Sequence, residues 1–310
     1  MTFLFENQIQ RYGYLELYAR QTVEGFITGL HKSPFHGFSS EFSEHRLYNQ
    51  GESVKHVDWK VFGRTDKLFV KRFEEETNLR CQILIDNSSS MFFPFNKKNE
   101  LINQSKINYA VFCAAVLIQL LKQQRDAFGL TVFSSDIEFH TEAKLSAQHH
   151  KFLLTHLDKI IQQAQQSQRK TTSAANAIHN IAERIHKRSL VIIFTDMFES
   201  NNNTDELMSA LQHLRHNKHE VIVFHVFDQQ KEVDFNYENR PHKFIDIETN
   251  EKLTLNPNEI RNFYKKRINE LFKSLHDKCL SYRIDLVETD INKKPAEILN
   301  PYLTKRKRLY

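Results

Sequence analysis

Short apolar runs alternate with longer amphipathic stretches over most of the chain from about residue 79 onward. The runs have strand length, are rich in Val, Ile, Leu and Phe, and end near polar clusters. A strand that is buried on both faces of a sheet needs such near-continuous apolar runs. We therefore predict buried strands at residues 81–85, 128–133, 190–194, 221–227 and 282–287.

The stretches between these runs carry apolar residues at helical spacing, as Ile107, Val111 and Ile118 do in the first of them. The same spacing predicts helices at residues 106–125, 173–186, 205–217 and 258–279. Strands that alternate with helices predict an α/β fold: a doubly wound, mainly parallel sheet with helices on both faces. An alternating run at residues 137–141 follows a tight turn and adds one antiparallel edge strand.

The first 78 residues have a different pattern. An amphipathic start leads to a segment rich in glycine and histidine, and alternation at residues 67–73 predicts a strand. We therefore expect two parts: a small, partly β N-terminal subdomain at residues 1–78, and an α/β domain at residues 79–310 that ends in a helical extension.

Composition indicates an ordinary globular protein, with 40% hydrophobic and 26% charged residues and a net charge of +5. The longest apolar stretch, residues 111–121, is too short to span a membrane, and the N-terminus lacks a signal-peptide pattern. Cys81, Cys113 and Cys279 lack metal-ligand spacing, and nothing suggests disulfides, which fits a reducing compartment. Cys81 and Cys113 lie in apolar surroundings and suit buried thiols. We therefore expect a cytoplasmic protein.

All seven glycines lie in the first 129 residues, and they form neither a GxGxxG nor a GxxxxGK[ST] motif. Phosphate-cradling loops need glycine so that backbone N–H groups can approach the phosphate. Dinucleotide and P-loop nucleotide binding are therefore poor hypotheses.

Oxygen-bearing side chains lie at the ends of the predicted elements. Asp86, Ser88 and Ser90 follow the first predicted strand, Asp196 follows the third, and Thr172 stands just before the second predicted helix. In open α/β sheets, ligands bind at the carboxyl edge of the strands. Hard cations such as Mg²⁺ prefer oxygen ligands, and the lack of His and Cys argues against zinc. The set predicts a cation site, with helix caps and strand ends as the structural alternative.

Three separated parts of this set resemble the metal-ion-dependent adhesion site of von Willebrand A domains: Asp86-x-Ser88-x-Ser90, Thr172 with Ala177-Ile178 after it, and Phe194-Thr-Asp196. The resemblance covers about residues 79–230 and implies a Rossmann-like fold of the von Willebrand A type. It further implies that Ser88, Ser90 and Thr172 ligate the ion directly. The two aspartates would act directly or through water.

A second motif lies ahead of the predicted buried strands. The run Arg46-x-Tyr48-x-x-Gly51-Glu52-x-x-Lys55-x-Val57-Asp58-Trp59 is similar to the signature R-x-Y-x-x-G-D-x-x-R-x-I-D-W of the bacterial domain-of-unknown-function 58 family. Glu52 and Lys55 depart from it conservatively. The chain resembles the shorter members of that family, which lack membrane helices. The resemblance implies a role beside MoxR-type AAA+ ATPases, as an adaptor in the assembly or maturation of other proteins.

From its residue types alone, the second motif has a structural interpretation. Tyr48 and Trp59 offer large apolar surfaces, and Arg46, Asp58 and Arg64 are able to form a buried charge network. We favour this structural role over ligand binding.

Three histidines, His213, His216 and His219, recur every three residues near the end of a predicted helix. Such a pair at positions i and i+3 can ligate zinc, but only Glu220 offers a carboxylate beside them. Cations near a helix C-terminus oppose its dipole favourably. We therefore favour a solvated cationic helix end.

The favoured function is a non-catalytic interaction module. It holds Mg²⁺, or Mn²⁺ or Ca²⁺, and binds an Asp or Glu of a protein partner, a MoxR-type AAA+ ATPase or its client. The alternative is a metal-dependent phosphohydrolase on the same oxygen cluster, which needs a general base or a second metal. Nucleic-acid binding through the basic tail at residues 304–310 is not expected, because no basic patch interleaved with aromatic residues accompanies it.

Overall fold

The computed structural model describes residues 13–27, 39–48, 57–76, 79–94, 105–163, 174–197, 204–246 and 251–309. The chain divides into two compact units. The smaller unit comprises Phe35–Leu79, and the larger comprises Met1–Pro34 with Arg80–Tyr310.

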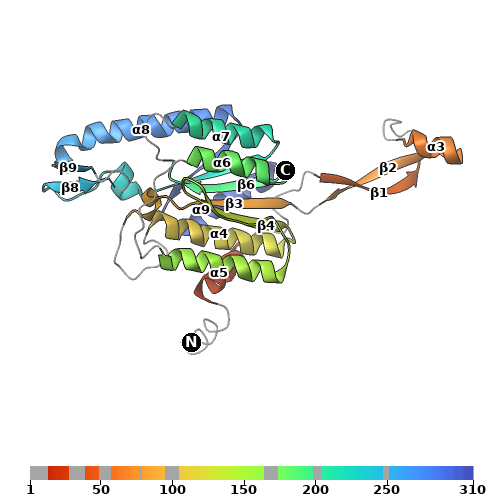
Figure 1. The fold of residues 1–310 in the computed structure, drawn as a ribbon, viewed down its shortest axis with the longest axis horizontal. Coiled ribbons are helices and arrows are strands. Elements are labelled where there is room, and N and C mark those ends of the chain that lie inside the picture. Colours follow the sequence, from red (N-terminus) through yellow and green to blue (C-terminus); the bar gives the residue numbers. More distant parts are fainter. Residues whose placement is uncertain are drawn as a thin grey trace. The chain divides into compact units, whose positions relative to one another are not determined.

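A six-stranded sheet forms the centre of the larger unit (Figure 1). Its strands are β3 (Arg80–Asp86), β4 (Ala127–Phe133), β5 (Ile137–His140), β6 (Leu190–Thr195), β7 (Glu220–Phe227) and β10 (Asp285–Asp290). They lie in the order β10-β7-β6-β3-β4-β5, and every neighbouring pair is parallel except β4 and β5. The predicted mainly parallel sheet with one antiparallel edge strand is confirmed.

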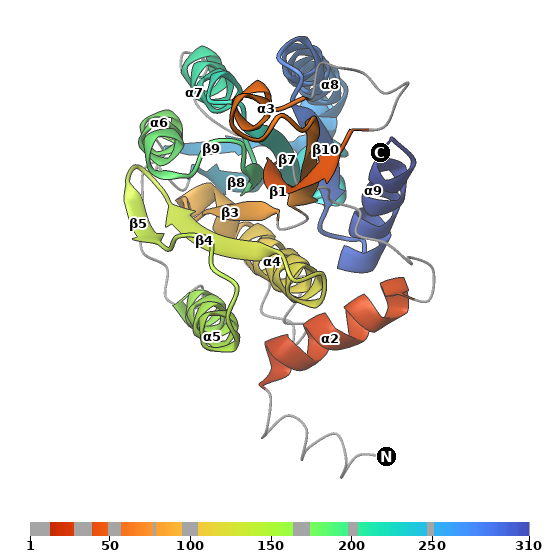
Figure 2. The same cartoon turned by 90° about the vertical axis from the view of Figure 1, so that its right-hand side faces the viewer.

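Helices cover both faces of this sheet (Figures 1 and 2). One face carries α6 (Ala174–Arg184), α7 (Thr204–His216) and α8 (Pro257–Ser281), and the other carries α4 (Lys106–Gln123) and α5 (Ala147–Gln163). Because both faces are covered, β3, β6 and β7 are buried almost throughout, as their apolar runs predict. Helix α4 is buried on all sides, since α5 and other helices pack over its outer surface.

The strand order reverses between β3 and β6. From β3 the chain passes through α4 to β4 on one side of β3, and it later passes through α6 to β6 on the other side. The carboxyl ends of β3 and β6 therefore form a topological switch point, the place where open α/β sheets bind ligands.

Helix α2 (Tyr14–Ile27) belongs to the larger unit, so the expected division after residue 78 differs from the structure at this helix. Its Leu15 and Val23 are buried, and Tyr18 packs edge-on against Phe112 of α4, with ring centroids 5.0 Å apart. The helix belongs to this unit because its apolar face is buried against α4.

The smaller unit pairs two antiparallel strands, β1 (Ser39–Leu47) and β2 (Phe69–Glu76), and places the short helix α3 (Trp59–Thr65) between them in sequence. Asp58 caps α3, since its carboxylate accepts the N–H of Lys60 at 3.0 Å.

Two expectations for the second motif are wrong. Trp59 is 60% exposed and Arg64 is exposed as well, because α3 buries no residue within its unit. They therefore do not supply the expected buried apolar surface and charge. Residues 49–56 of the motif lie outside the described residues.

Strand β10 begins three residues later than predicted. The N–H of Tyr282 donates to Lys278 O at the end of α8, and Arg283 has a φ of 57°. These residues therefore form the exit of the helix and not the start of the strand.

The apolar pattern did not predict α5 or the hairpin of β8 (His242–Ile245) and β9 (Lys252–Leu255). The expected C-terminal helical extension corresponds to α9 (Pro295–Leu309). Within the part of the chain that the structure describes, no helix combines the length and apolar character needed to cross a membrane.

Candidate metal centre

The end of β3 and the turn after it bring three oxygen-bearing side chains together. Asp86 Oδ1 accepts the backbone N–H of Ser88 at 2.9 Å, which turns the chain tightly after the strand. Ser90 lies in η2, the 3₁₀ turn Ser89–Phe92, and its Oγ is 3.1 Å from Ser88 Oγ. Asp86 and Ser88 are buried, whereas Ser90 is half-buried. Ser90 therefore lies on the accessible side of the cluster.

Strand β6 delivers Asp196 to the same edge. Because Ile85 pairs with Phe194 in the parallel ladder, the ends of β3 and β6 are neighbours. The hydroxyl of Thr195 donates to Asp86 Oδ2 at 2.7 Å and ties the two strand ends together. Burial, and next the negative charge of Asp196, raise the pKa of Asp86 to about 7. Two buried carboxylates thus share this edge of the sheet.

Lys106, the first residue of α4, joins the cluster from the opposite side. Its ammonium donates to Asp196 Oδ2 at 2.8 Å and to Glu232 Oε1 at 2.6 Å, and its side chain is 1% exposed. Burial alone lowers the pKa of a lysine, but the two carboxylates outweigh burial and hold the pKa of Lys106 above its usual value. Lys106 is therefore a buried, permanently charged part of the centre.

Glu232 comes from η3, the π-helical turn Gln229–Val233 after β7. Its Oε2 accepts the N–H of Asp228 at 2.7 Å, which holds the carboxylate toward Lys106. Behind Asp196, the Nε2 of His225 lies 3.0 Å from the backbone oxygen of Asp196. Burial lowers the pKa of His225 to about 4, so this imidazole is neutral near pH 7.

The charges of these groups do not balance. Asp86, Asp196 and Glu232 are three carboxylates, Lys106 supplies one ammonium and His225 is neutral, so two negative charges remain when all three carboxylates are ionised. Near pH 7 the raised pKa of Asp86 reduces this surplus, because that carboxyl is then partly protonated. Burying charge without a counter-charge is costly. A divalent cation would balance this surplus.

The donors fit such an ion in kind and spacing. Two oxygens in neighbouring positions of an octahedral Mg²⁺, each about 2.1 Å from the metal, lie about 3 Å apart, close to the 3.1 Å between Ser88 Oγ and Ser90 Oγ. Among the described residues, no group of three His, Cys, Asp or Glu side chains is arranged to hold a metal. The serine hydroxyls would therefore have to act as ligands.

The structure brings four of the five predicted site residues to one sheet edge: Asp86, Ser88, Ser90 and Asp196. Thr172 lies outside the described residues. That the set holds an ion stays a prediction.

The sequence pattern missed Lys106 and Glu232. Lys106 opens a helix that is mostly apolar, and a lysine buried at its start requires a carboxylate partner. The position of Lys106 could therefore have been recognised from the sequence. Glu232 lies in a polar segment, and nothing in the sequence around it points to a buried carboxylate.

The solvated helix end expected for the three histidines is wrong for one of them. His219 is buried, and its Nδ1 accepts the N–H of Ser189 at 3.2 Å. Burial lowers the pKa of His219 to about 4, so it is neutral. His216 is exposed, and His213 is half-buried beside His179.

Curated relatives of the chain occur in mycobacteria. An uncharacterized protein of Mycobacterium bovis and two of Mycobacterium tuberculosis are each 25% identical over 214 residues, which is 69% of this chain and 63% of each relative. The chain thus spans less than two thirds of the length of these relatives.

Solved structures show looser likenesses. The conserved hypothetical protein BatB from Bacteroides thetaiotaomicron has a TM-score of 0.44 at 13% identity, covering 74% of this chain and 100% of that chain. An aerotolerance-related membrane protein from Bacteroides fragilis has a TM-score of 0.46 at 13% identity, covering 75% and 100%. Likenesses at this level do not bear on function.

A family model described as "Protein of unknown function DUF58" matches residues 44–271. The match spans strands β3 to β7 and every described residue of the candidate metal centre. Because it covers well over half of the sequence, the chain belongs to the DUF58 family.

Proposed function

We propose that this protein is a non-catalytic interaction module that binds a carboxylate of a protein partner through a divalent cation. The cation is Mg²⁺, with Mn²⁺ or Ca²⁺ as alternatives, and its ligands come from Asp86, Ser88, Ser90, Thr172 and Asp196. The observation that supports this most strongly is the surplus of buried negative charge beside two neutral hydroxyls at the switch point of the sheet.

The donor set suits an ion that must still accept a ligand. Hydroxyls carry no charge, so Ser88 and Ser90 would leave the ion electrophilic. The ammonium of Lys106 already engages Asp196 Oδ2, which reduces the negative charge that this aspartate offers to a metal. An incoming Asp or Glu would then supply charge that the protein's own ligands withhold. Mg²⁺ usually retains water in its shell, and a carboxylate can replace that water.

The resemblance to von Willebrand A and DUF58 proteins suggests who the partner is. It favours a MoxR-type AAA+ ATPase or a client of that ATPase, with the present chain as an adaptor in the reducing cytoplasm. A carboxylate on the partner, and not a nucleic acid, is the feature we expect the centre to recognise.

The test measures cation binding and partner binding in the same variants. Isothermal titration with Mg²⁺ on the purified chain gives the first, and capture of a co-expressed MoxR-type ATPase with and without EDTA gives the second. We expect Asp86→Ala to lose both. Asp136→Ala, an exposed aspartate in the turn before β5, is the matched control and should retain both. Capture that is equal in wild type and Asp86→Ala, with or without EDTA, would contradict the proposal.

A phosphohydrolase on the same oxygens remains the alternative, and it requires a general base or a second metal. The imidazole nearest to Asp196, His225, is buried and already engages a backbone oxygen. Phosphatase turnover that Asp196→Asn abolishes would support the enzyme over the binding module.

A further inference from the structure

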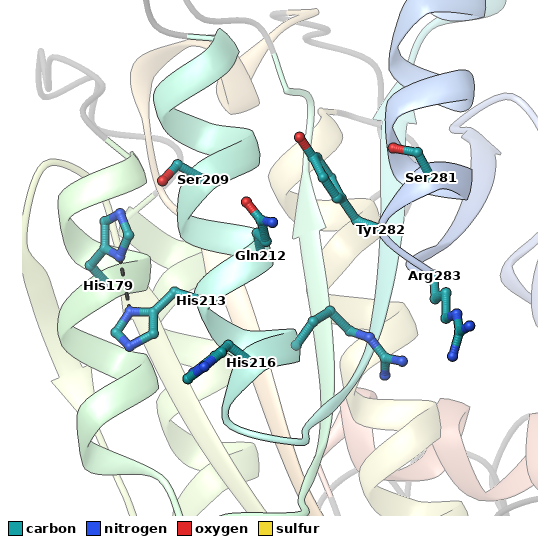
Figure 3. A pocket seen from close by; sticks show the side chains of 9 residues that line it. His179, Ser209, Gln212, His213, His216, Ser281, Tyr282 and Arg283 are labelled. Carbon is teal, nitrogen blue, oxygen red and sulfur yellow. Dashed lines mark hydrogen bonds between the residues drawn. The ribbon is translucent and has the colours of Figure 1, made fainter.

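An open pocket of about 590 Å³ lies in the larger unit where α6, α7 and the end of α8 meet (Figure 3). Nitrogen-bearing side chains dominate its lining: His179, Gln212, His213, Arg215, His216 and Arg283. No Asp or Glu lines the described part of this pocket. It is separate from the oxygen cluster at the ends of β3 and β6.

Two histidines from different helices face each other in this pocket. His179 of α6 and His213 of α7 bring their Nδ1 atoms to 3.0 Å, the contact drawn as a dashed line in Figure 3. The helices approach closely because small and apolar side chains, such as Ala182 and Leu214, are buried between them. Asn217 Nδ2 also donates to Ala182 O at 3.1 Å and fixes the end of α7 on α6. The histidine pair therefore sits at the edge of a packed helix–helix contact.

Glu183 orients one of the two rings. Its Oε1 lies 3.0 Å from Nε2 of His213, so this nitrogen donates its proton to the carboxylate. In a neutral imidazole, the other nitrogen then carries the lone pair. Nδ1 of His213 is therefore an acceptor that points at His179. A carboxylate that fixes the tautomer of a ligating histidine in this way is a recurrent feature around metal ions.

We propose that His179 and His213 bind one divalent transition-metal ion, Zn²⁺, Ni²⁺ or Cu²⁺, through their Nδ1 atoms. With metal–nitrogen bonds of about 2.0 to 2.1 Å, two adjacent ligands lie about 2.9 to 3.4 Å apart, depending on the geometry. The 3.0 Å between the two Nδ1 atoms falls within that range. In the metal-free pair, His179 Nδ1 donates to His213 Nδ1, so binding the ion requires His179 to carry its proton on Nε2 instead. A modest rotation about χ2, a broad torsion in histidine, then turns both Nδ1 lone pairs toward a shared ion.

The remaining coordination positions are open. Among the described residues, no trio of His, Cys, Asp or Glu is arranged to hold a metal, so water completes the shell. His216, one helical turn after His213, lines the same pocket and can reach the ion by a rotamer change. Two nearby arginines lower the affinity, although the guanidinium of Arg215 is engaged with His219 O at 2.7 Å. The site therefore binds more weakly than a closed structural zinc site.

Metal titration of the chain without an affinity tag tests the site. We expect Zn²⁺ to bind with a dissociation constant tighter than about 100 µM. Co²⁺ bound in the same site should give visible absorption bands that are shifted from those of aqueous Co²⁺, because imidazole nitrogens replace water as ligands. His179→Gln and His213→Gln should each weaken Zn²⁺ binding at least tenfold. Glu183→Gln, a positioning variant, should weaken it less while the shifted Co²⁺ spectrum persists.

Two controls separate this site from the oxygen centre and from chance binding. His276→Gln removes an exposed histidine of α8 and should change nothing, and Asp86→Ala should also leave Zn²⁺ affinity unchanged. Mg²⁺ at millimolar concentration should not compete, because imidazole pairs select transition metals. Affinity that is unaffected by both His179→Gln and His213→Gln, or weaker than about 100 µM in wild type, overturns the proposal.

Discussion

Lys106 is the residue on which the charge balance of the oxygen centre depends most. Replacing it with Met keeps most of the apolar stem but leaves Asp196 and Glu232 buried without their ammonium. Removing one partner of a buried ion pair costs about 3 to 5 kcal/mol. We therefore expect Lys106→Met to lower the unfolding free energy by about that amount in EDTA. Mg²⁺ should restore part of the loss and bind more tightly than in wild type, as calorimetry can measure.

A surface ion pair provides the control for that substitution. Lys265 contacts Asp234 at 3.1 Å, with both side chains about 40% exposed. Exposed pairs contribute about 0 to 1 kcal/mol, so Lys265→Met should be nearly neutral and should not alter Mg²⁺ affinity. A Lys106→Met variant with unchanged stability, or with weaker Mg²⁺ binding, would show that the ammonium does not share its carboxylates with a cation.

His219 makes stability depend on pH. Burial first, and then the nearby His213, lower the folded pKa of His219 to about 4 against the hydrogen bond from Ser189, whereas the unfolded chain titrates near 6.5. The unfolded state therefore takes up a proton as pH falls below about 6.5 and the folded state does not. The contribution of neutral His219 to the free energy of unfolding is therefore complete above pH 6.5 and is lost as the pH falls toward 4. We expect this histidine to account for about 1 to 2 kcal/mol of that decline.

His219→Asn isolates this contribution. The Asn side chain can still accept the N–H of Ser189 but does not titrate, and the other buried histidines, His150 and His225, remain in both proteins. Urea unfolding at pH 7 and pH 4.5 should show a smaller pH-dependent loss in the variant. Equal losses in both proteins would mean that His219 is not the neutral, buried group described above.

At the scale of elements, burial on both faces made the strands predictable. The runs that became β3, β4, β6 and β7 are apolar at nearly every position because helices cover both sides, and their bounds differ from prediction by one residue at most. Among the described strands, β10 pairs only with β7, and it is partly exposed. Its apolar pattern is therefore weaker, and the predicted strand began three residues before the observed one. Helix α5 has Leu153, Leu157 and Ile160 on one buried face, but polar residues between them, such as His156 and Lys159, obscured that stripe.

One backbone position in β4 controls how closely its neighbours approach. Gly129 pairs with Gln82 of β3, whose Nε2 reaches across to Thr131 Oγ1 at 2.8 Å and to Thr141 O at 3.0 Å. A Cβ on residue 129 would collide with Gln82 Oε1 and would lie 2.7 Å from Thr141 O. Because the second contact is with a backbone atom, a rotation of the Gln82 side chain alone cannot relieve the clash.

We therefore expect Gly129→Ala to lower the unfolding free energy by about 1 to 3 kcal/mol, the usual cost of overpacking. Gly25→Ala in α2 has open space around the added methyl group and serves as the matched change. Alanine is favoured over glycine within a helix, so the control should be neutral or stabilising by up to about 1 kcal/mol. Denaturant unfolding measures the free energy of unfolding of both variants. If Gly129→Ala were as stable as wild type, the backbone at Thr141 would be able to move away from β4 without cost.

At the scale of the whole molecule, the order of strands and helices predicted the fold and the location of the centre, but not its charge balance. Asp86 and Asp196 follow runs that had to be buried parallel strands, and such strands end at one sheet edge. Lys106 and Glu232 meet 126 positions apart in sequence, through the packing of α4 against the segment after β7. Contacts of that kind depend on tertiary geometry and leave no periodic signal. The contact between His179 and His213 likewise depends on how α6 packs against α7, so the sequence pattern does not predict it.

The oxygen centre should also couple cation binding to the stability of the folded chain. A ligand that binds only the folded state at a hundred times its dissociation constant adds about 2.7 kcal/mol, which corresponds to a rise in Tm of about 4 to 8 °C for a domain of this size. We expect Tm to rise steadily with the logarithm of the Mg²⁺ concentration. Asp86→Asn should abolish that rise and yet be at least as stable as wild type in EDTA, because it removes one of two adjacent buried carboxylates. The wild-type Tm should therefore rise above that of Asp86→Asn as Mg²⁺ is added. A wild-type Tm that does not change with Mg²⁺ would show that the centre does not bind the cation, and that Lys106 is its only counter-charge.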